Sequence, residues 1–123
     1  MDYLKLKQMN NTPTTVKIKP LTVNQCWKGR RTKTDDYVCY EETLYYKLLP
    51  SNVFIPKGKL KIYLVFGVSN VNSDWDNPIK PFVDILQKKY NFNDNRIYFA
   101  SVHKKKVKKG EEYILFNISE YDL

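Results

Sequence analysis

The sequence has very few of the residues on which common metal sites and hydrolase triads depend. Its 123 residues include one histidine, two cysteines and four glycines. The single histidine, His103, excludes histidine-pair metal sites and argues against a Ser-His-Asp arrangement. Cys26 and Cys39 lack the paired spacing of a zinc site and are too few for a disulfide framework, so we expect reduced structural thiols. Any catalytic chemistry must therefore use carboxylates and lysine.

Long apolar runs are also missing. No segment approaches the ~20 apolar residues that span a bilayer, and none combines a basic face with an apolar face over several turns. Residues 1–5 do not lead into the apolar segment of a signal peptide. We therefore expect a cytoplasmic protein with no membrane partner.

Positive charge dominates the composition. The chain carries 21 Lys and Arg against 13 Asp and Glu, which gives a formal net charge of +8. Summed positive potential concentrates polyanions near a protein, so this balance favours an anionic partner such as nucleic acid. At this length, with 42% apolar residues, the chain can bury one core, and we expect a single packed domain.

Alternation and helical spacing together predict an α+β fold. The clearest pattern is over 60–68, where alternating apolar residues predict a strand with one buried face. The polar residues 1–13 predict a loosely ordered N-terminal arm, which leaves 14–123 for the domain. The order β-α-β-α-β-β fits one mixed sheet with two helices on one face. The expected strands are 14–19, 60–68, 96–102 and 112–118, the expected helices are 36–49 and 78–90, and a lysine-rich hairpin around Lys108, Lys109 and Gly110 is expected to join the last two strands.

Both expected helices show apolar residues at helical spacing. Thr34 or Asp35 can cap the first helix, and Pro50 is expected to end it. The buried faces are expected to consist of Tyr37, Leu44, Tyr45, Leu48 and Leu49 in the first helix, and of Ile79, Phe82, Val83, Leu86 and Tyr90 in the second.

A cation-rich loop precedes the first helix. Residues 21–33 place Trp27 among Lys28, Arg30, Arg31 and Lys33. Such cations can clamp phosphates, and an exposed aromatic ring among them can stack on a base. For Trp27 alone, packing into the core is an equally good interpretation, whereas the cations as a group favour phosphate binding.

Aspartates gather just after the central strand. Asp74 and Asp76 are two residues apart, so in an extended segment both side chains would project to one face. Carboxylates that close repel each other, and a divalent cation relieves the repulsion. An EF-hand does not fit, because the glycine at loop position six and the glutamate at position twelve are missing. Asp94 follows the second helix, and a strand-helix-strand path can return it beside the end of the central strand to complete a Mg²⁺ site.

Lys80 lies four residues after Asp76 and four before Asp84, on one helical face if the helix has begun there. It could hold Asp76, orient an attacking water or stabilise charge that develops on a phosphate. The competing interpretation is a surface ion pair worth ~0.5 kcal/mol, in which Asp84 is a structural partner for Lys80 or Lys88. Asn77 could cap the helix or support a metal-bound water, and we expect the capping use.

This stretch resembles the mark of a known family, the RusA-type Holliday junction resolvases of phages and prophages. The mark is Asp-x-Asp-Asn-x-x-Lys-x-x-x-Asp-x-Leu, followed by a short loop with another aspartate just before a strand. The resemblance extends over most of the chain beyond the arm, including the loop with Asn24 and the terminal basic hairpin. Every fixed position of the mark is filled, by Asp74, Asp76, Asn77, Lys80, Asp84 and Leu86, and Asp94 follows.

The resemblance implies a RusA-like fold, a phage or prophage gene, and a homodimer with two magnesium-dependent sites that nick opposed strands of a four-way DNA junction. The matching metal-binding aspartates are Asp74, Asp76 and Asp94, and the matching catalytic lysine is Lys80. Mn²⁺ is the alternative ion.

The chain departs from the family pattern in two places. Pro78 and Pro81 flank Lys80, and a residue before proline is pushed out of the αR region. The helix is therefore expected to start later than in the family and to aim Lys80 differently. Asn93 stands where relatives often carry another acid.

The residues and the resemblance together predict a magnesium-dependent, structure-specific endodeoxyribonuclease that resolves Holliday junctions in DNA recombination and repair. A metal-activated water would attack the phosphodiester while Lys80 or the metal neutralises the developing charge. The competing hypotheses are a nuclease acting on flaps or forks, and a non-catalytic basic DNA-binding module. DNA contacts are expected from Asn24, Lys28, Arg30, Arg31, Lys33, Lys88, Lys89, Lys104, Lys105, Lys106, Lys108 and Lys109.

Overall fold

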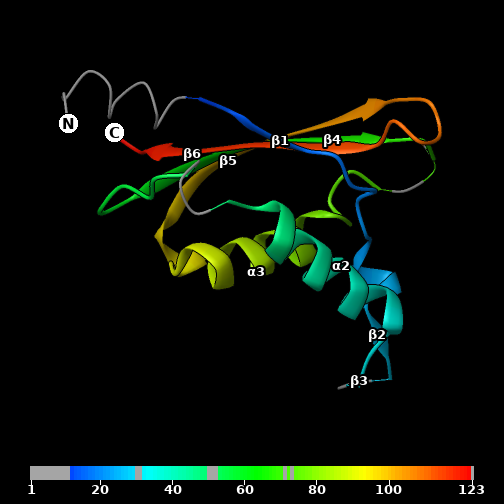
Figure 1. The fold of residues 1–123 in the computed structure, drawn as a ribbon. Coiled ribbons are helices and arrows are strands. Elements are labelled where there is room, and N and C mark those ends of the chain that lie inside the picture. Colours follow the sequence, from blue (N-terminus) through cyan, green and yellow to red (C-terminus); the bar gives the residue numbers. More distant parts are fainter. Residues whose placement is uncertain (1–11, 30–31, 50–52, 71, 73, 123) are drawn as a thin grey trace.

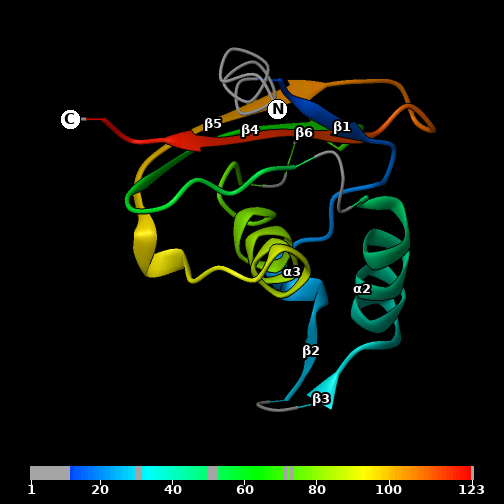
Figure 2. The same ribbon diagram turned by 60° about the vertical axis from the view of Figure 1, so that its left-hand side comes forward.

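The computed structural model describes residues 12–29, 32–49, 53–70, 72 and 74–122. Its strands are β1 (Thr14–Val16), β2 (Trp27–Lys28), β3 (Thr32–Lys33), β4 (Leu60–Val68), β5 (Ile97–Lys106) and β6 (Tyr113–Glu120), and its helices are α2 (Asp35–Lys47) and α3 (Ile79–Tyr90), with short 3-10 helices at Val23–Gln25 and Asp94–Arg96. One four-stranded sheet has the order β1-β6-β4-β5, and β2 and β3 form a separate two-stranded ribbon. Both α-helices lie on one face of the larger sheet (Figures 1 and 2). The predicted α+β class is therefore confirmed.

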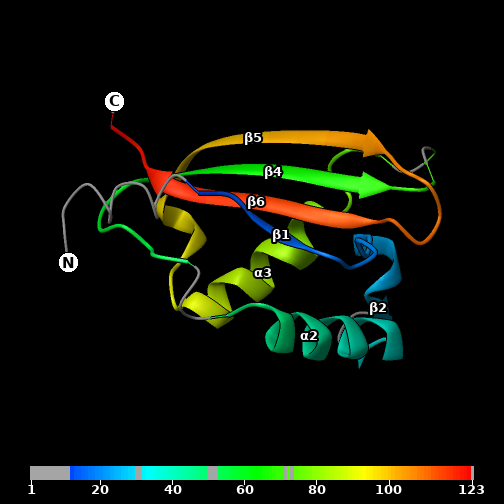
Figure 3. The ribbon, with the colours of Figure 1, turned by 45° about the horizontal axis from the view of Figure 1, so that its top comes forward.

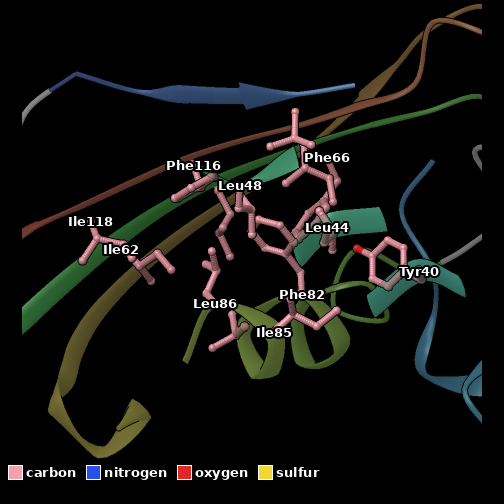
Figure 4. Close-up of a cluster of buried hydrophobic side chains, with 14 of the residues drawn as sticks. Tyr40, Leu44, Leu48, Ile62, Phe66, Phe82, Ile85, Leu86, Phe116 and Ile118 are labelled. Atoms are coloured by element: carbon pink, nitrogen blue, oxygen red, sulfur yellow. The ribbon is translucent and has the colours of Figure 1, made fainter. Parts of the chain in front are cut away.

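β4 is the centre of the fold, and its sequence pattern determines which face of the sheet is buried. Its side chains alternate, with Leu60, Ile62, Leu64 and Phe66 buried. These side chains share the core with residues of both helices and of β6. Figure 4 shows Ile62 and Phe66 of β4 beside Phe82 of α3, Leu44 of α2 and Phe116 of β6. The predicted bounds of this strand, 60–68, are confirmed.

An aromatic cluster fixes α3 beneath the sheet. The Phe82 ring of α3 contacts the rings of Phe66 and Phe116, with centroid distances of 6.1 and 5.5 Å and edge-to-face geometry. All three side chains are almost completely buried. Because each phenylalanine buries a large apolar area, this contact between α3, β4 and β6 is a principal source of stability.

The pairing of the last two strands differs from the prediction. β4 pairs with β5 in parallel and with β6 in antiparallel fashion, so β4 lies between them (Figure 3). The predicted hairpin between the last two strands is therefore wrong. Residues 107–112 instead cross the end of β4, where the Val107 amide donates to the Val68 carbonyl oxygen at 2.9 Å. β5 extends to Lys106, beyond its predicted end, and is an edge strand of this sheet.

The N-cap of α2 is Thr34, one of the two predicted candidates. The Thr34 hydroxyl accepts a hydrogen bond from the Tyr37 amide at 3.1 Å, which satisfies one of the unpaired donors of the first turn. Asp35 is then the first helical residue rather than the cap. The helix ends at Lys47, and Pro50, which was predicted to end it, lies outside the described residues.

The buried face of α2 is only partly as predicted. It consists of Tyr37, Tyr40 and Leu44, with Leu48 buried just beyond the helix. Tyr45 and Leu49 were expected on this face, but both are exposed. A helix of 3.6 residues per turn rotates Tyr45 100° away from Leu44, so two adjacent apolar residues cannot both face the core centre.

α3 begins at Ile79, despite the two prolines. Pro78 is in the αR region and occupies the N-cap position. Pro81 lies in the first turn, where its missing N–H would have no partner within the helix in any case. α3 thus begins one residue after the predicted start at residue 78, and Lys80 lies in its first turn. Asn77 precedes the cap position and does not cap the helix as predicted.

The remaining predictions concern the N-terminal segment, the thiols and the membrane. β1 ends at Val16, before the predicted end at residue 19, and residues 1–11 of the predicted arm lie outside the described residues. Both cysteines are free, Cys26 buried in the core and Cys39 exposed. Among the described residues, no helix has the length and apolar character needed to cross a membrane.

Candidate functional site

The segment after β4 folds into turns rather than continuing extended. The Asn77 amide donates to the Asp74 carbonyl oxygen at 3.3 Å, and the Ile79 amide donates to the Asp76 carbonyl oxygen at 3.1 Å. These bonds close two successive turns that lead into α3. The expectation that Asp74 and Asp76 project to one face of an extended segment is therefore wrong, since side chains two apart diverge in a turn.

Asp76 and Asp94 nevertheless line one pocket, together with Lys80. This pocket of about 550 Å³ lies between α3 and the edge strand β5, and we call it the edge groove. Its lining includes Trp75, Asp76, Lys80, Val83, Asp94 and Val102. Residues from the turn, the helix and the start of β5 thus share one site, as the sequence predicted for three of them.

The C-terminal end of α3 positions Asp94. The Asp94 amide donates to the Gln87 side-chain oxygen at 2.8 Å, and Asp94 begins the 3-10 helix that leads into β5. The Asn93 side chain caps that 3-10 helix by accepting from the Asn95 amide at 2.9 Å. Asn93 therefore has a structural use at the position where the resembled family often carries an acid. Gln87 was not identified from the sequence.

Asp74 lines a different pocket. This second pocket has a volume of about 450 Å³, and we call it the amide pocket because Asn24, Gln25, Asn70, Asn72 and Asn77 line it beside Asp74. The Val23 amide donates to the Asn77 carbonyl oxygen at 2.9 Å, which ties the early loop to the turn. Asn24, which was predicted to contact DNA, shares this pocket with Asp74, but Asp74 does not line the edge groove.

Lys80 pairs with Asp84. The Lys80 ammonium lies 3.0 Å from the Asp84 carboxylate, one helical turn away. The hydrogen bond and charge of Asp84 raise the pKa of Lys80, and the nearby charge of Asp94 adds to this. Gln87 also donates to Asp84, at 3.4 Å. The predicted ion pair between Lys80 and Asp84 is thus confirmed. The negative charge of Asp94, which lines the same groove, also acts on Lys80.

The donor set at the edge groove fits magnesium by its chemistry. Mg²⁺ takes oxygen ligands, keeps several waters and is usually held by one or two carboxylates together with substrate phosphates. Asp76 and Asp94 supply two carboxylates. Within the described ranges, no cluster of three or more histidine, cysteine, aspartate or glutamate side chains is arranged to hold a metal ion. Among the described residues, the edge groove offers the carboxylates of Asp76 and Asp94 as candidate ligands.

Glu41 forms ion pairs with two of the lysines that were predicted to bind DNA. Its carboxylate lies 2.8 Å from the Lys33 ammonium and 3.2 Å from that of Lys88. Burial acts to raise the pKa of Glu41, but the hydrogen bonds from the two lysines outweigh it and hold this pKa below its usual value. The bridge connects the β2–β3 ribbon, α2 and α3. Glu41 was not identified from the sequence, since its two partners lie on other elements and Lys88 is 47 residues away along the chain.

Trp27 was predicted either to be exposed for base stacking or to pack into the core, and the structure shows some of both. Its ring is 44% exposed and meets the buried Tyr37 ring edge-on, at a centroid distance of 5.6 Å. Lys28 is exposed beside it on β2, whereas Arg30 and Arg31 lie outside the described residues.

Lys89, another of the predicted DNA-binding residues, lies on α3, and its ammonium group donates to the Tyr45 carbonyl oxygen at 2.9 Å.

The lysines at the end of β5 divide between the two faces of the sheet. Lys104 and Lys106 are paired in register with Phe66 and Val68, whereas Lys105 is paired with Gly67. Side chains alternate along a strand, and Phe66 points into the core, so Lys104 and Lys106 lie on the helix-covered face and Lys105 on the other. Lys108 and Lys109 are exposed in the connection to β6. The predicted basic hairpin is therefore not one continuous DNA-binding surface.

The groove also contains a residue that the sequence analysis passed over. Trp75 stands between the two aspartates of the motif, and its side chain is 59% exposed at the edge groove. A tryptophan flanked by two acids in a polar turn was the available signal, because such a residue has little reason to be in a turn unless it packs or binds.

Comparison with known proteins adds no relative. A scan against models of known protein families finds no match to the chain, and neither does a search of curated proteins.

Proposed function

We propose that the protein is a magnesium-dependent, structure-specific endodeoxyribonuclease that cuts four-way DNA junctions by paired nicks. The observation that carries the proposal is the convergence of Asp76 and Asp94, from segments separated by the whole of α3, with Lys80 at one open groove. The net charge of +8 supports a polyanionic substrate. The resemblance of the Asp74–Leu86 motif to RusA-type resolvases supplies the substrate class.

The groove residues divide the chemistry between them. Bound Mg²⁺ would activate a water and stabilise charge on the phosphate, as divalent ions do in phosphoryl hydrolysis. Asp76 and Asp94 are the residues that would hold the ion. Lys80 would be drawn toward the phosphate while Asp84 keeps it charged and oriented. Asp74 would act from the amide pocket as a weaker, indirect contributor.

The cations would bind the DNA backbone. Lys104 and Lys106 share the groove's side of the sheet, and contacts to phosphates carry little sequence information, as recognition of branch shape requires. We also propose that the active form is a homodimer, because paired nicks in opposed strands require two sites. On the resemblance alone, we place the protein in the cytoplasm of a bacterial cell, encoded by a phage or prophage.

A second candidate function is favoured by one observation. Lys80 is paired with Asp84, so its ammonium group is already engaged by a carboxylate on the same helix. A non-catalytic DNA-binding module would need the lysines and not the aspartates. A nuclease for flaps or forks would keep the metal site and differ only in substrate.

A synthetic four-way junction distinguishes these functions. With Mg²⁺, or with Mn²⁺ in its place, the wild-type protein should make symmetric paired nicks, and none when the ion is chelated. Asp76→Asn should bind the junction without cutting it, whereas Asp122→Asn, an exposed aspartate far along the chain, should cut normally. Binding without cleavage by the wild type under both ions would contradict the nuclease. Faster cutting of flaps or forks than of junctions would contradict the junction assignment alone.

A further inference from the structure

The edge groove has apolar walls that metal binding does not require. Seven apolar residues contribute to them, and they come from the central strand, from α3 and from the edge strand: Ile62, Leu64, Ile79, Val83, Ile97, Ala100 and Val102. The Trp75 ring is 59% exposed at the same groove. A hydrated ion and a phosphate gain nothing from apolar walls, and apolar surface left in water is unfavourable. An open apolar groove of about 550 Å³ is of a size typical for a ligand site.

The charges around the groove indicate which ligand fits. Lys80 is at the groove, and Lys104 follows Val102 on the same face of β5. Asp76 and Asp94 line the same groove and would repel a phosphate unless a divalent ion lay between them. With such an ion bound, a ligand with both an apolar face and anionic groups matches this combination, and in nucleic acid the apolar faces belong to the bases. A base stacked within a duplex has both faces covered by its neighbours. Only a base that has left the stack can present its face to Trp75.

We propose that the edge groove binds a nucleobase that has left the DNA stack, with its face on Trp75 and its neighbouring phosphate at Asp76, Lys80 and Asp94. This inference rests on the proposed nuclease function and names the source of its structure selectivity. Extrusion of a base costs least where stacking is already interrupted, as at a branch point. Stacking on an aromatic ring is tolerant of base identity, so the groove would select branched over continuous DNA without reading a sequence.

Tryptophan fluorescence tests base binding without any need for cleavage. The chain has two tryptophans, so a Trp27→Phe variant reports on Trp75 alone. With Mg²⁺ present and cleavage blocked by Asp76→Asn, a four-way junction should quench Trp75 emission more strongly than a matched duplex does. A junction with abasic sites at the branch should lose that quenching. Equal quenching by duplex and junction, or quenching that persists with abasic sites, overturns the proposal.

A pair of aromatic substitutions provides the matched affinity test. Trp75→Ala should weaken junction binding roughly tenfold, as loss of one base-stacking contact does, and Trp75→Phe should restore most of it. Phe99→Ala is the control, because Phe99 is 52% exposed and neighbours Ala100 on β5, which places it on the opposite face of the sheet. Equal effects of Trp75→Ala and Phe99→Ala would contradict the proposal.

Three further outcomes distinguish base binding from the nuclease function and from occupation of the groove by a second copy of the chain. Junction-specific quenching in a wild-type protein that never cuts would support base binding and overturn the nuclease. Cleavage with no such quenching would do the reverse. If Trp75→Ala instead converts a dimer into monomers in sedimentation, a second copy of the chain fills the groove and the proposal is overturned.

Discussion

The edge groove and the amide pocket lie on two sides of the same turn, and they differ in almost every property. The edge groove is mostly apolar, with Asp76 and Asp94 among its lining residues, whereas the amide pocket is rich in asparagine and contains Asp74. Asp74 and Asp76 are nearly adjacent in sequence, yet they separate. Asp76 and Asp94 are distant in sequence, yet they share a pocket. A turn thus separates carboxylates that are neighbours in sequence, whereas the crossover through α3 brings distant ones to the same pocket.

Substitution of each aspartate by asparagine is the strongest test of this division. Asparagine keeps the size of the side chain and removes its charge. Asp76→Asn and Asp94→Asn should each reduce the rate of junction cleavage roughly a thousandfold, because each removes a carboxylate from the shared groove. Asp74→Asn should cost only about tenfold, the loss typical of a group outside the direct ligand set. Single-turnover cleavage at saturating protein measures all three.

Metal titration makes the same test independent of the rate. The apparent Mg²⁺ requirement should rise for Asp76→Asn and Asp94→Asn, and much less for Asp74→Asn. Equal losses in all three variants would mean that the turn rearranges to bring Asp74 into the groove when DNA or metal binds. The division between the two pockets would then not describe the active state.

The two faces of the sheet also differ in which lysines they carry. Lys104 and Lys106 lie on the groove side, and Lys105 and Lys61 lie on the other side. Replacing Lys104 and Lys106 together by glutamine should weaken DNA binding and make the slope of log affinity against log salt shallower by about two. The control is the double replacement of Lys61 and Lys105, which removes the same charge.

Titration of junction binding over a series of salt concentrations measures both variants. Net charge is reduced equally in the two, so a difference in slope can only come from position. If the two doubles behave alike, DNA is attracted by overall charge, and the groove side has no privileged contact with the backbone.

The sequence predicted the elements that depend on one local pattern. The strict alternation of β4 and the amphipathic spacing of α3 determine their own bounds, so 60–68 and 78–90 agree closely with the structure. Thr34 was recognisable as a cap because capping involves only the next three residues. Asp76, Lys80 and Asp94 were identified as one group because the motif names them, and the fold brings them together.

Features that depend on long-range pairing could not be predicted in this way. The signal around Gly110 marks a turn, but it does not say that β4 lies between the strands on each side. The separation of Asp74 from Asp76 follows from two hydrogen bonds within the turn, and a charge pattern carries no record of these. Glu41 joins Lys33 and Lys88 across three elements, and only the packing of α2 against α3 makes that contact.

The ion pairs at Glu41 provide the smallest predicted effect, and they lie outside both pockets. Glu41→Gln should lower the free energy of unfolding by about 1 kcal/mol at neutral pH, because the Glu41 side chain is only 15% exposed and bridges two lysines. Junction cleavage at saturating DNA should change little. Urea denaturation at several pH values measures the loss, and Glu42→Gln, an exposed neighbour on α2, is the control.

The sign of the pH dependence follows from the lowered pKa of Glu41 in the folded protein. Above the pKa of glutamate in the unfolded chain the stabilisation is fully present, because the carboxylate is charged in both states and paired only in the folded one. As the pH falls through the lower, folded value, the folded protein also takes up the proton and the ion pairs are lost. The wild-type and Glu41→Gln proteins should then converge in stability, whereas a constant difference down to acid pH would mean that packing of the side chain, and not its charge, holds the ribbon to the helices.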